Sequence, residues 1–162
     1  NQVEASPIRV EADEVTYNLH ILLRFELERE MLEERVGVGD LPELWMDRME
    51  AYLGIRPEND AVGVLQDVHW SLGLIGYFPT YSLGNLYAAQ FFSRAQVEMP
   101  DLMDQVGQGQ LLGLRQWLRK KIHRRGKRLT AQELVEEVTG EPLRVDFLME
   151  YLEGKFGELY DL

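Results

Sequence analysis

GVLQDVHWSLGLIGYFPTYSLGNLYAAQ, residues 63–90, is the stretch that decides how this chain folds. It holds three Tyr, one Trp, one His and four Gly, and it is nearly free of charge in a chain that is 28% charged. Rings with polar tips beside glycines, which allow close backbone approach, are typical of a buried site. A well-packed helix–turn–helix core would have the same composition, because aromatic stripes are more often core than site. Both interpretations predict that the rest of the chain packs around this stretch.

Helical spacing of apolar residues continues on both sides of it, and we find no persistent alternation of the kind that strands show. The sequence therefore predicts an all-α fold of seven or eight helices with short loops, packed as a single helical unit over residues 1–162. The helices are expected over residues 9–35, 41–53, 64–70, 79–98, a short segment after Pro100, 110–125, 130–139 and 145–160.

Three of the expected helices carry clear signals at their ends or along their faces. In the first, Leu22 and Leu27 fall on the inward side and Glu28 on an acidic outer side. Thr130 and Glu133 have the spacing of a capping box, in which each side chain accepts from the other residue's backbone N–H. Glycines are expected to end the second and seventh helices in the left-handed conformation.

The length, cysteine content and net charge of the chain limit the classes of function that it could have. A length of 162 residues indicates about one domain. The absence of cysteine excludes disulfides and thiolate metal sites, and favours a reducing compartment, so we expect a cytoplasmic protein. A net charge of −11 argues against nucleic acid or an anionic membrane as the main partner. No run is apolar and long enough to span a bilayer.

The sequence does not contain a recognisable metal or nucleotide motif. Its three histidines, His20, His69 and His123, are far apart, and there is no H-E-x-x-H pair. There is also no P-loop and no dinucleotide fingerprint. We therefore expect that this chain alone binds no metal.

The segment 115–128 carries eight Lys or Arg residues and no acid. One interpretation is a solvated helix face whose charges balance the acidic remainder of the chain. The other is a site for an anionic ligand, such as the C-terminus of a peptide. Nucleic acid fits less well, because aromatic residues are not interleaved with the charges.

Arg9 and Asp13 lie one helical turn apart in the segment IRVEAD. An ion pair at the start of a helix would explain them. Alternatively, Asp13 aims the guanidinium of Arg9, whose planar fork suits bidentate capture of a carboxylate.

Two separated motifs, Ile8-Arg9-x-x-Ala12-Asp13 and Gly63-x-x-Gln66-Asp67-x-x-Trp70, resemble signature motifs of the carboxypeptidase Taq family of metallocarboxypeptidases. The flanking segments 17–28, 52–70, 76–90 and 139–143 are similar to that family as well, so the resemblance spans nearly the whole chain. It implies a helical enzyme that removes single residues from peptide C-termini with a bound zinc or cobalt ion.

The resemblance also implies roles for residues on the substrate side. Arg9 is expected to bind the terminal carboxylate of the peptide substrate, with Asp13 orienting it and Arg128 as a weaker second candidate. Gln66 and Asp67 are expected to brace their loop more than to touch substrate.

His69, together with Tyr77 or Tyr81, resembles the groups that stabilise the oxyanion of the tetrahedral intermediate in helical metallopeptidases. Tyr81 is the preferred donor, because a turn over residues 76–79 could aim its hydroxyl.

The family's metal ligands precede the Arg9 motif in family order and are not in this sequence. Since the chain also begins at Asn1 and not at Met, we expect it to be the C-terminal third of such an enzyme, inactive alone. Its partners would be the upstream metal-binding segment and, through an apolar open face, a second copy in a homodimer. The alternative is a non-catalytic, all-helical protein-interaction module.

Overall fold

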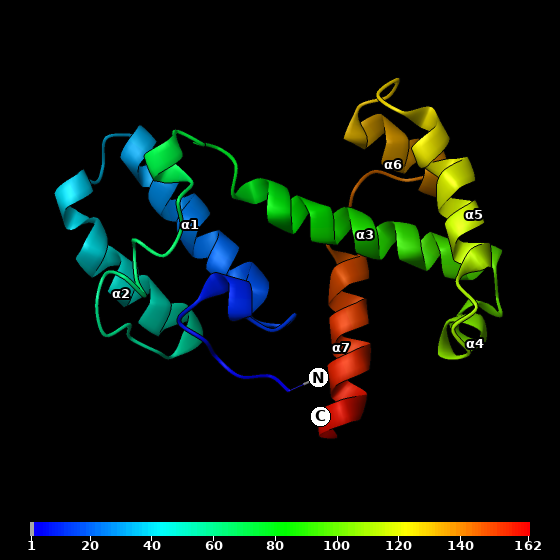
Figure 1. Ribbon diagram of the computed structural model, residues 1–162, viewed down its shortest axis with the longest axis horizontal. Helices are drawn as coiled ribbons and strands as arrows, with labels where there is room; N and C mark the ends of the chain where they lie inside the picture. The colour runs from blue at the N-terminus through cyan, green and yellow to red at the C-terminus, as the bar shows by residue number, and fades with distance from the viewer. Residues whose placement is uncertain (1) are drawn as a thin grey trace. The chain divides into compact units, whose positions relative to one another are not determined.

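The computed structural model describes residues 2–162 as helices joined by loops, the longest of which spans residues 54–69 between α2 and η3 (Figure 1). No strand occurs among these residues, which confirms the predicted all-α class. The α-helices are α1 (Tyr17–Leu32), α2 (Leu41–Leu53), α3 (Pro79–Glu98), α4 (Leu102–Gly107), α5 (Leu112–Lys121), α6 (Ala131–Thr139) and α7 (Asp146–Tyr160). Short 3-10 helices are η1 (Arg9–Glu11), η2 (Val38–Asp40), η3 (Trp70–Leu72) and η4 (His123–Arg125). None of the helices in this described range has both the length and the apolar character needed to cross a bilayer.

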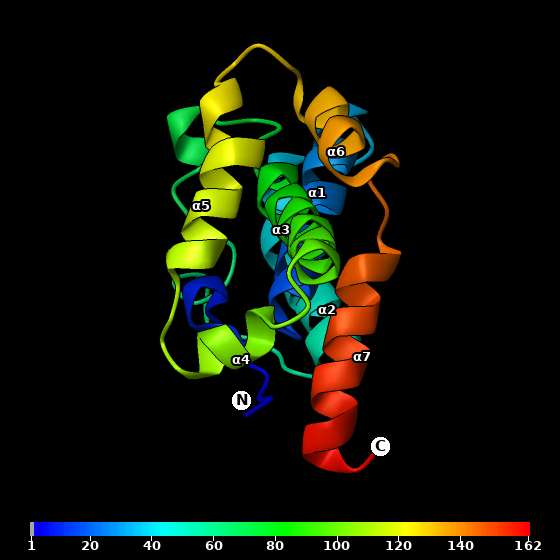
Figure 2. The same ribbon diagram turned by 90° about the vertical axis from the view of Figure 1, so that its right-hand side faces the viewer.

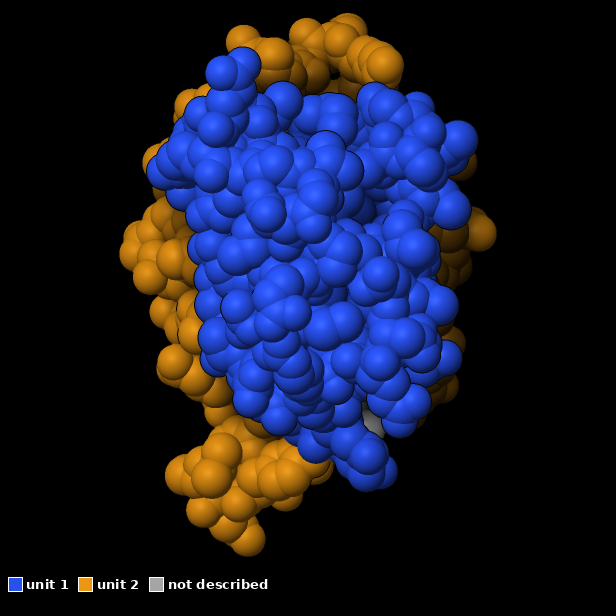
Figure 3. Space-filling model, turned by 90° about the vertical axis from the view of Figure 1, so that its left-hand side faces the viewer, with its two compact units in different colours: residues 1–82 blue, residues 83–162 orange. Residues whose placement is uncertain are grey.

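The helices pack as two compact units, residues 1–82 (unit 1) and residues 83–162 (unit 2), which Figure 3 shows in different colours. The boundary falls inside α3, so that the first turn of this helix belongs to unit 1. The expectation of a single helical unit stays a prediction.

The core of unit 1 forms where α1 packs against α2. Apolar side chains from both helices meet there, and five of them are fully or almost fully buried: Leu23, Leu27, Leu41, Trp45 and Met49. The helix α2 has the bounds that the sequence predicts, and Gly54 ends it in the left-handed conformation with φ 69°. A glycine is favoured at this position because it has no Cβ to clash.

The prediction of one long helix over residues 9–35 is wrong, because the backbone leaves the helical conformation between η1 and α1. Ala12 is extended, with φ −63° and ψ 141°. The carboxylate of Asp13 then accepts hydrogen bonds of 2.9 Å from the backbone N–H groups of Val15 and Thr16. These bonds satisfy N–H groups at the start of α1 that would otherwise need another helical turn.

The short helix predicted over residues 64–70 is also wrong. Turns occupy this part of the loop, and regular structure begins only at η3. The side-chain Nε2 of Gln66 donates to the carbonyl oxygens of Val62 (3.0 Å) and Gly63 (3.2 Å). The Gly63 carbonyl also accepts from the backbone N–H of Gln66 at 3.2 Å, so a backbone turn and the Gln66 side chain together satisfy this segment in place of an α-helix.

Unit 2 is built on the remainder of α3. Figure 2 looks along this helix and shows α5 and α7 on opposite sides of it. Its buried apolar cluster comprises Ala95, Leu102, Trp117 and Val138. The predicted capping box at α6 is confirmed: Thr130 Oγ1 accepts from the N–H of Glu133, and the Glu133 carboxylate accepts from the N–H of Thr130.

Leu22 and Leu27 provide a matched pair on one helix. The sequence predicts both on the inward side, but Leu27 is 0% exposed whereas Leu22 is 45% exposed, so the prediction is wrong for Leu22. Leu27→Ala is expected to lower the free energy of unfolding by about 2–5 kcal/mol, because it leaves a cavity in the core of unit 1. Leu22→Ala should cost no more than about 0.5 kcal/mol. Urea denaturation of both variants measures the difference, and equal losses would contradict this assignment of the buried face.

Candidate functional site

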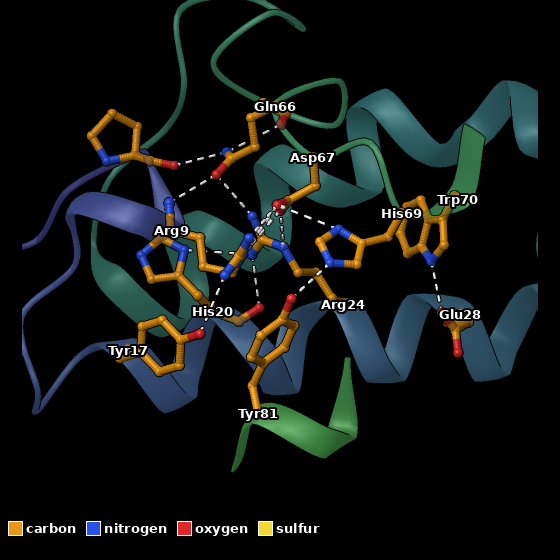
Figure 4. Close-up of polar contacts among 12 residues, drawn as sticks. Arg9, Tyr17, His20, Arg24, Glu28, Gln66, Asp67, His69, Trp70 and Tyr81 are labelled. Carbon is orange, nitrogen blue, oxygen red and sulfur yellow. Dashed lines mark hydrogen bonds and ion pairs between the residues drawn. The ribbon is translucent and has the colours of Figure 1, made fainter. Parts of the chain in front are cut away.

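Polar side chains from four segments of unit 1 meet beside α1 (Figure 4). η1 contributes Arg9, and α1 contributes Arg24. The loop before η3 contributes Gln66, Asp67 and His69, and the first turn of α3 contributes Tyr81. We call these six residues the Asp67 cluster.

The carboxylate of Asp67 is shared between two arginines. Its Oδ1 accepts from Arg9 Nη2 at 2.6 Å and from Arg9 Nε at 3.1 Å. Its Oδ2 accepts from Arg24 Nε at 2.6 Å. Arg24 is fully buried and Arg9 is 7% exposed. One carboxylate therefore ties η1, α1 and the loop together through charge-assisted hydrogen bonds.

The charges in this cluster do not cancel, because two guanidinium groups face one carboxylate. Burial acts to raise the pKa of Asp67, but hydrogen bonds from Arg9 and the charge of Arg24 outweigh it and hold that pKa below its usual value. Burial lowers the pKa of Arg24 to about 10, although Asp67 opposes the shift. All three groups are charged at neutral pH, which leaves an excess of one positive charge.

Gln66 connects the same segments through its amide. The Oε1 atom accepts from the backbone N–H of Arg9 and from Arg24 Nη2, both at 2.8 Å. The Nε2 atom donates to the carbonyl oxygen of Pro7 at 2.9 Å. These bonds fix the backbone at Pro7 and Arg9, and the role expected for Gln66 and Asp67 stays a prediction.

The end of the Arg9 guanidinium keeps donors for a ligand. Asp67 binds the side that carries Nε and Nη2, and Tyr17 Oη lies 3.2 Å from Nη1. An arginine has five N–H groups. Within residues 2–162 these bonds use one N–H on each nitrogen, so one N–H of Nη1 and one of Nη2 remain. Two such donors on adjacent nitrogens match the two oxygens of a carboxylate.

His69 and Tyr81 form a hydrogen-bonded pair beside Arg9. His69 Nε2 and Tyr81 Oη are 3.0 Å apart, and His69 Nδ1 lies 3.7 Å from Asp67 Oδ1. The guanidinium carbon of Arg9 lies 5.1 Å from the centre of the Tyr81 ring, within the range of a cation–π interaction. Figure 4 shows the three side chains pointing toward one another around Asp67.

Tyr77 belongs to the same group of rings but lies at its edge. Its ring centre is 5.7 Å from that of His69 and 5.5 Å from that of Tyr81, and the residue is 45% exposed. Arg128 is not a member of the cluster: it belongs to unit 2, where it is exposed between η4 and α6.

Asp13 does not hold Arg9, contrary to the sequence prediction. Its carboxylate accepts instead from backbone N–H groups, at the start of α1 and from Glu4 at 2.9 Å. Burial acts to raise the pKa of Asp13, but these N–H groups outweigh it and lower that pKa. Asp67, which comes from a distant part of the sequence, takes the place beside Arg9.

A stripe of buried polar residues on α1 was not predicted. His20, Arg24 and Glu28 are spaced by four residues, so they share one face of the helix. Glu28, expected on the outer face, accepts from Trp70 Nε1 at 2.7 Å and from the backbone N–H of Gly76 at 2.5 Å. The spacing H-x-x-x-R-x-x-x-E is visible in the sequence and could have indicated a polar interior face.

No group of three or more His, Asp or Glu side chains that could hold a metal ion exists within residues 2–162. The residues of the Asp67 cluster do not fit a metal either, because two arginines already bind its single carboxylate. The charges and donors of this cluster suit an anion or a hydrogen-bonding group better than a metal ion.

Comparison with known proteins relates the chain to a family of enzymes. A family model described as Carboxypeptidase Taq (M32) metallopeptidase matches residues 1–156. Thermostable carboxypeptidase 1 of Thermus thermophilus is 49% identical over 160 residues, which cover 99% of this chain and 31% of that protein. Carboxypeptidase 1 of Bacillus subtilis is 44% identical over 160 residues, covering 99% and 32%. The crystal structure of an M32 carboxypeptidase from Deinococcus radiodurans R1 matches with a TM-score of 0.97 and 45% identity, covering 100% of this chain and 33% of that one.

The chain belongs to the M32 carboxypeptidase Taq family, which confirms the resemblance seen in its motifs. It spans about a third of the length of the relatives that it matches.

Removing the Asp67 charge tests how much the cluster contributes to stability. Asp67→Asn leaves two buried guanidinium groups without their counter-ion, and it is expected to cost about 3–5 kcal/mol in the free energy of unfolding. The control is Glu43→Gln, which removes an exposed partner of Arg56 and should cost about 1 kcal/mol or less. Similar losses in the two variants, measured by urea denaturation, would show that the cluster is not a buried ion network.

The buried His20 makes a prediction about pH. Burial, aided by the charge of Arg24, lowers the pKa of His20 from 6.5 to about 4. As pH falls from about 6.5 to about 4, the unfolded chain binds a proton that the folded chain does not, so stability should decrease by about 1.4 kcal/mol per pH unit.

His20→Leu should remove this contribution to the slope of unfolding free energy against pH. The pKa values of Asp13 and Asp67 are lowered below 3.8, so their contributions are lost at still lower pH. A slope between pH 4 and 6.5 that is the same in wild type and variant would contradict the prediction.

Proposed function

We propose that this chain is part of a metal-dependent carboxypeptidase, which hydrolyses single residues from peptide C-termini, and that it supplies the groups that hold the end of the substrate. Membership of the M32 family supports the reaction class and favours it over a non-catalytic interaction module. The observation that carries the proposal is the Asp67 cluster, in which a fixed, nearly buried arginine with free donors lies beside a His–Tyr pair.

In this proposal Arg9 binds the terminal carboxylate of the peptide. Asp67 and Tyr17 fix the guanidinium before substrate arrives, so little side-chain freedom is lost on binding. The excess positive charge of the cluster favours an anion. A peptide that continues past the scissile bond offers a neutral amide at this point, which would leave the two donors of Arg9 without a carboxylate. Selectivity for the chain end follows from that difference.

Tyr81, with His69 beside it, is proposed to stabilise the oxyanion that forms when the peptide carbonyl is attacked. A well-placed donor at such a site contributes about 3–4 kcal/mol to the transition state. Tyr77 is a weaker candidate for this role. Its ring contacts the ring of His69, whereas the hydroxyl of Tyr81 is hydrogen-bonded to His69, which in turn faces Asp67. Arg128 is a weaker candidate than Arg9 for the carboxylate, because it is exposed and outside the cluster.

The metal of the enzyme, zinc or cobalt in our proposal, is held by a part of the enzyme other than residues 2–162. The proposal is supported by the described residues, among which no group of three or more His, Asp or Glu side chains could hold a metal ion. The role proposed for this chain is to bind and orient the substrate.

Arg9→Ala tests the carboxylate assignment. The assay uses a chimera in which this chain replaces the matching 160 residues of Bacillus subtilis carboxypeptidase 1. Loss of a charge-assisted, bidentate contact should lower kcat/KM for free-acid peptides by about 10- to 150-fold, with little change for C-terminally amidated peptides. Arg35→Ala, at an exposed arginine of unit 1 outside the Asp67 cluster, serves as the matched control and should change neither. Equal losses on both kinds of peptide would mean that Arg9 supports the fold and does not bind the carboxylate.

The chain alone is expected to lack peptidase activity, because its described residues, 2–162, include no group of three or more His, Asp or Glu that could hold a metal ion. Release of C-terminal amino acids from a peptide mixture, followed by mass spectrometry, measures this directly, with the chimera as positive control. Release by the purified 162-residue chain that a chelator abolishes would contradict the proposed division of the enzyme.

A further inference from the structure

His69 lies between a carboxylate and a phenol, so the position of one proton on its ring determines what Tyr81 can do. Nδ1 faces Asp67 Oδ1 at 3.7 Å, and Nε2 is 3.0 Å from Tyr81 Oη. A neutral imidazole carries its hydrogen on one nitrogen and accepts with the other. Two tautomers are therefore available, and they give Tyr81 opposite roles.

The surroundings of Nδ1 distinguish between these tautomers. This atom is buried and makes no hydrogen bond to any described residue. Its nearest charged neighbour is the Asp67 carboxylate, which has only acceptors while it is ionised. A lone pair on Nδ1 would be repelled by that carboxylate, whereas an N–H would be attracted to it across 3.7 Å. The environment favours the tautomer with hydrogen on Nδ1.

We propose that Asp67 is a positioning residue that acts through His69: it keeps the imidazole hydrogen on Nδ1, so that Nε2 accepts the hydroxyl hydrogen of Tyr81. Asp67 thus has a second role besides holding the two arginines. The catalytic meaning of this arrangement rests on the proposed function, but the tautomer is a property of this chain by itself.

The arrangement assigns different tasks to His69 and Tyr81. With Nε2 as an acceptor, His69 has no hydrogen to offer on the side where Tyr81 lies. Tyr81 is then the donor to the oxyanion, and its hydroxyl hydrogen rotates from Nε2 toward the substrate. His69 holds this hydroxyl in place beforehand. Ring packing supports that task, because the centre of the His69 ring lies 4.4 Å from that of Phe78.

The tautomer can be measured by two-bond ¹⁵N–¹H correlation NMR on the ¹⁵N-labelled chain, at a pH where its histidines are neutral. Only three histidines are present, so the ring signals are few. For His69 we expect a protonated Nδ1 and an unprotonated Nε2, with the exposed His123 as an internal reference. Hydrogen on Nε2 of His69 would overturn the proposal.

Two substitutions then separate the influence of Asp67 from that of Tyr81. Tyr81→Phe removes the hydroxyl but leaves the carboxylate, so the hydrogen should stay on Nδ1. If it moves to Nε2, Tyr81 sets the tautomer and the proposal is wrong. Tyr77→Phe is the matched control, because Tyr77 contacts the same ring without a hydrogen bond to it.

Asp67→Asn should shift the tautomer populations toward Nε2–H in any variant protein that folds. If that variant does not fold, the Tyr81→Phe spectrum still decides between the two outcomes. The chimera assay addresses the carboxypeptidase proposal separately, so an inactive chimera with the expected tautomer would contradict the proposed function and not this inference.

Discussion

The rest of unit 1 depends on one carboxylate, that of Asp67, placed between the buried guanidinium groups of Arg9 and Arg24. A buried charge is costly unless it is paired and hydrogen-bonded. The loop that carries Asp67 must therefore stay where both arginines can reach it, and η1 must stay beside α1. The loop before η3 is fixed in this way by charge and hydrogen bonding, in addition to the packing of Ile55 and Val64 against the core of unit 1.

The pairing of Asp67 with two arginines also explains the positive charge of the site and the free donors of Arg9. Pairing two cations with one anion leaves positive charge in a place with little water, where electrostatic interactions are stronger than at the surface. Arg9 keeps donors at its free end because Asp67 binds the other side of its guanidinium. His69 faces the same carboxylate, and Tyr81 faces His69. Structural pairing and the proposed substrate binding thus use different faces of the same few groups.

The sequence predicted the helical class, the bounds of two helices and the capping box, because these depend on local spacing and on residues close in the chain. Through the family resemblance it also predicted Arg9, His69 and Tyr81 as site residues, and the structure brings these three side chains together. It placed Asp13 beside Arg9, since neighbours in sequence are the partners that local patterns can indicate. The true partner is separated by 58 residues, and only the packing of the loop against α1 brings it there. The burial of Glu28 was missed for the same reason.

Exchange of the arginine Nε–H protons with solvent, followed by NMR on the unmodified chain, tests the central claim most directly. If one buried carboxylate holds both guanidinium groups, Arg9 and Arg24 will show separate Nε–H signals that exchange much more slowly than that of Arg128, which is exposed. Fast exchange at Arg9 together with slow exchange at Arg24 would show that Asp67 holds only one of them, and the account of a prearranged carboxylate site would be contradicted.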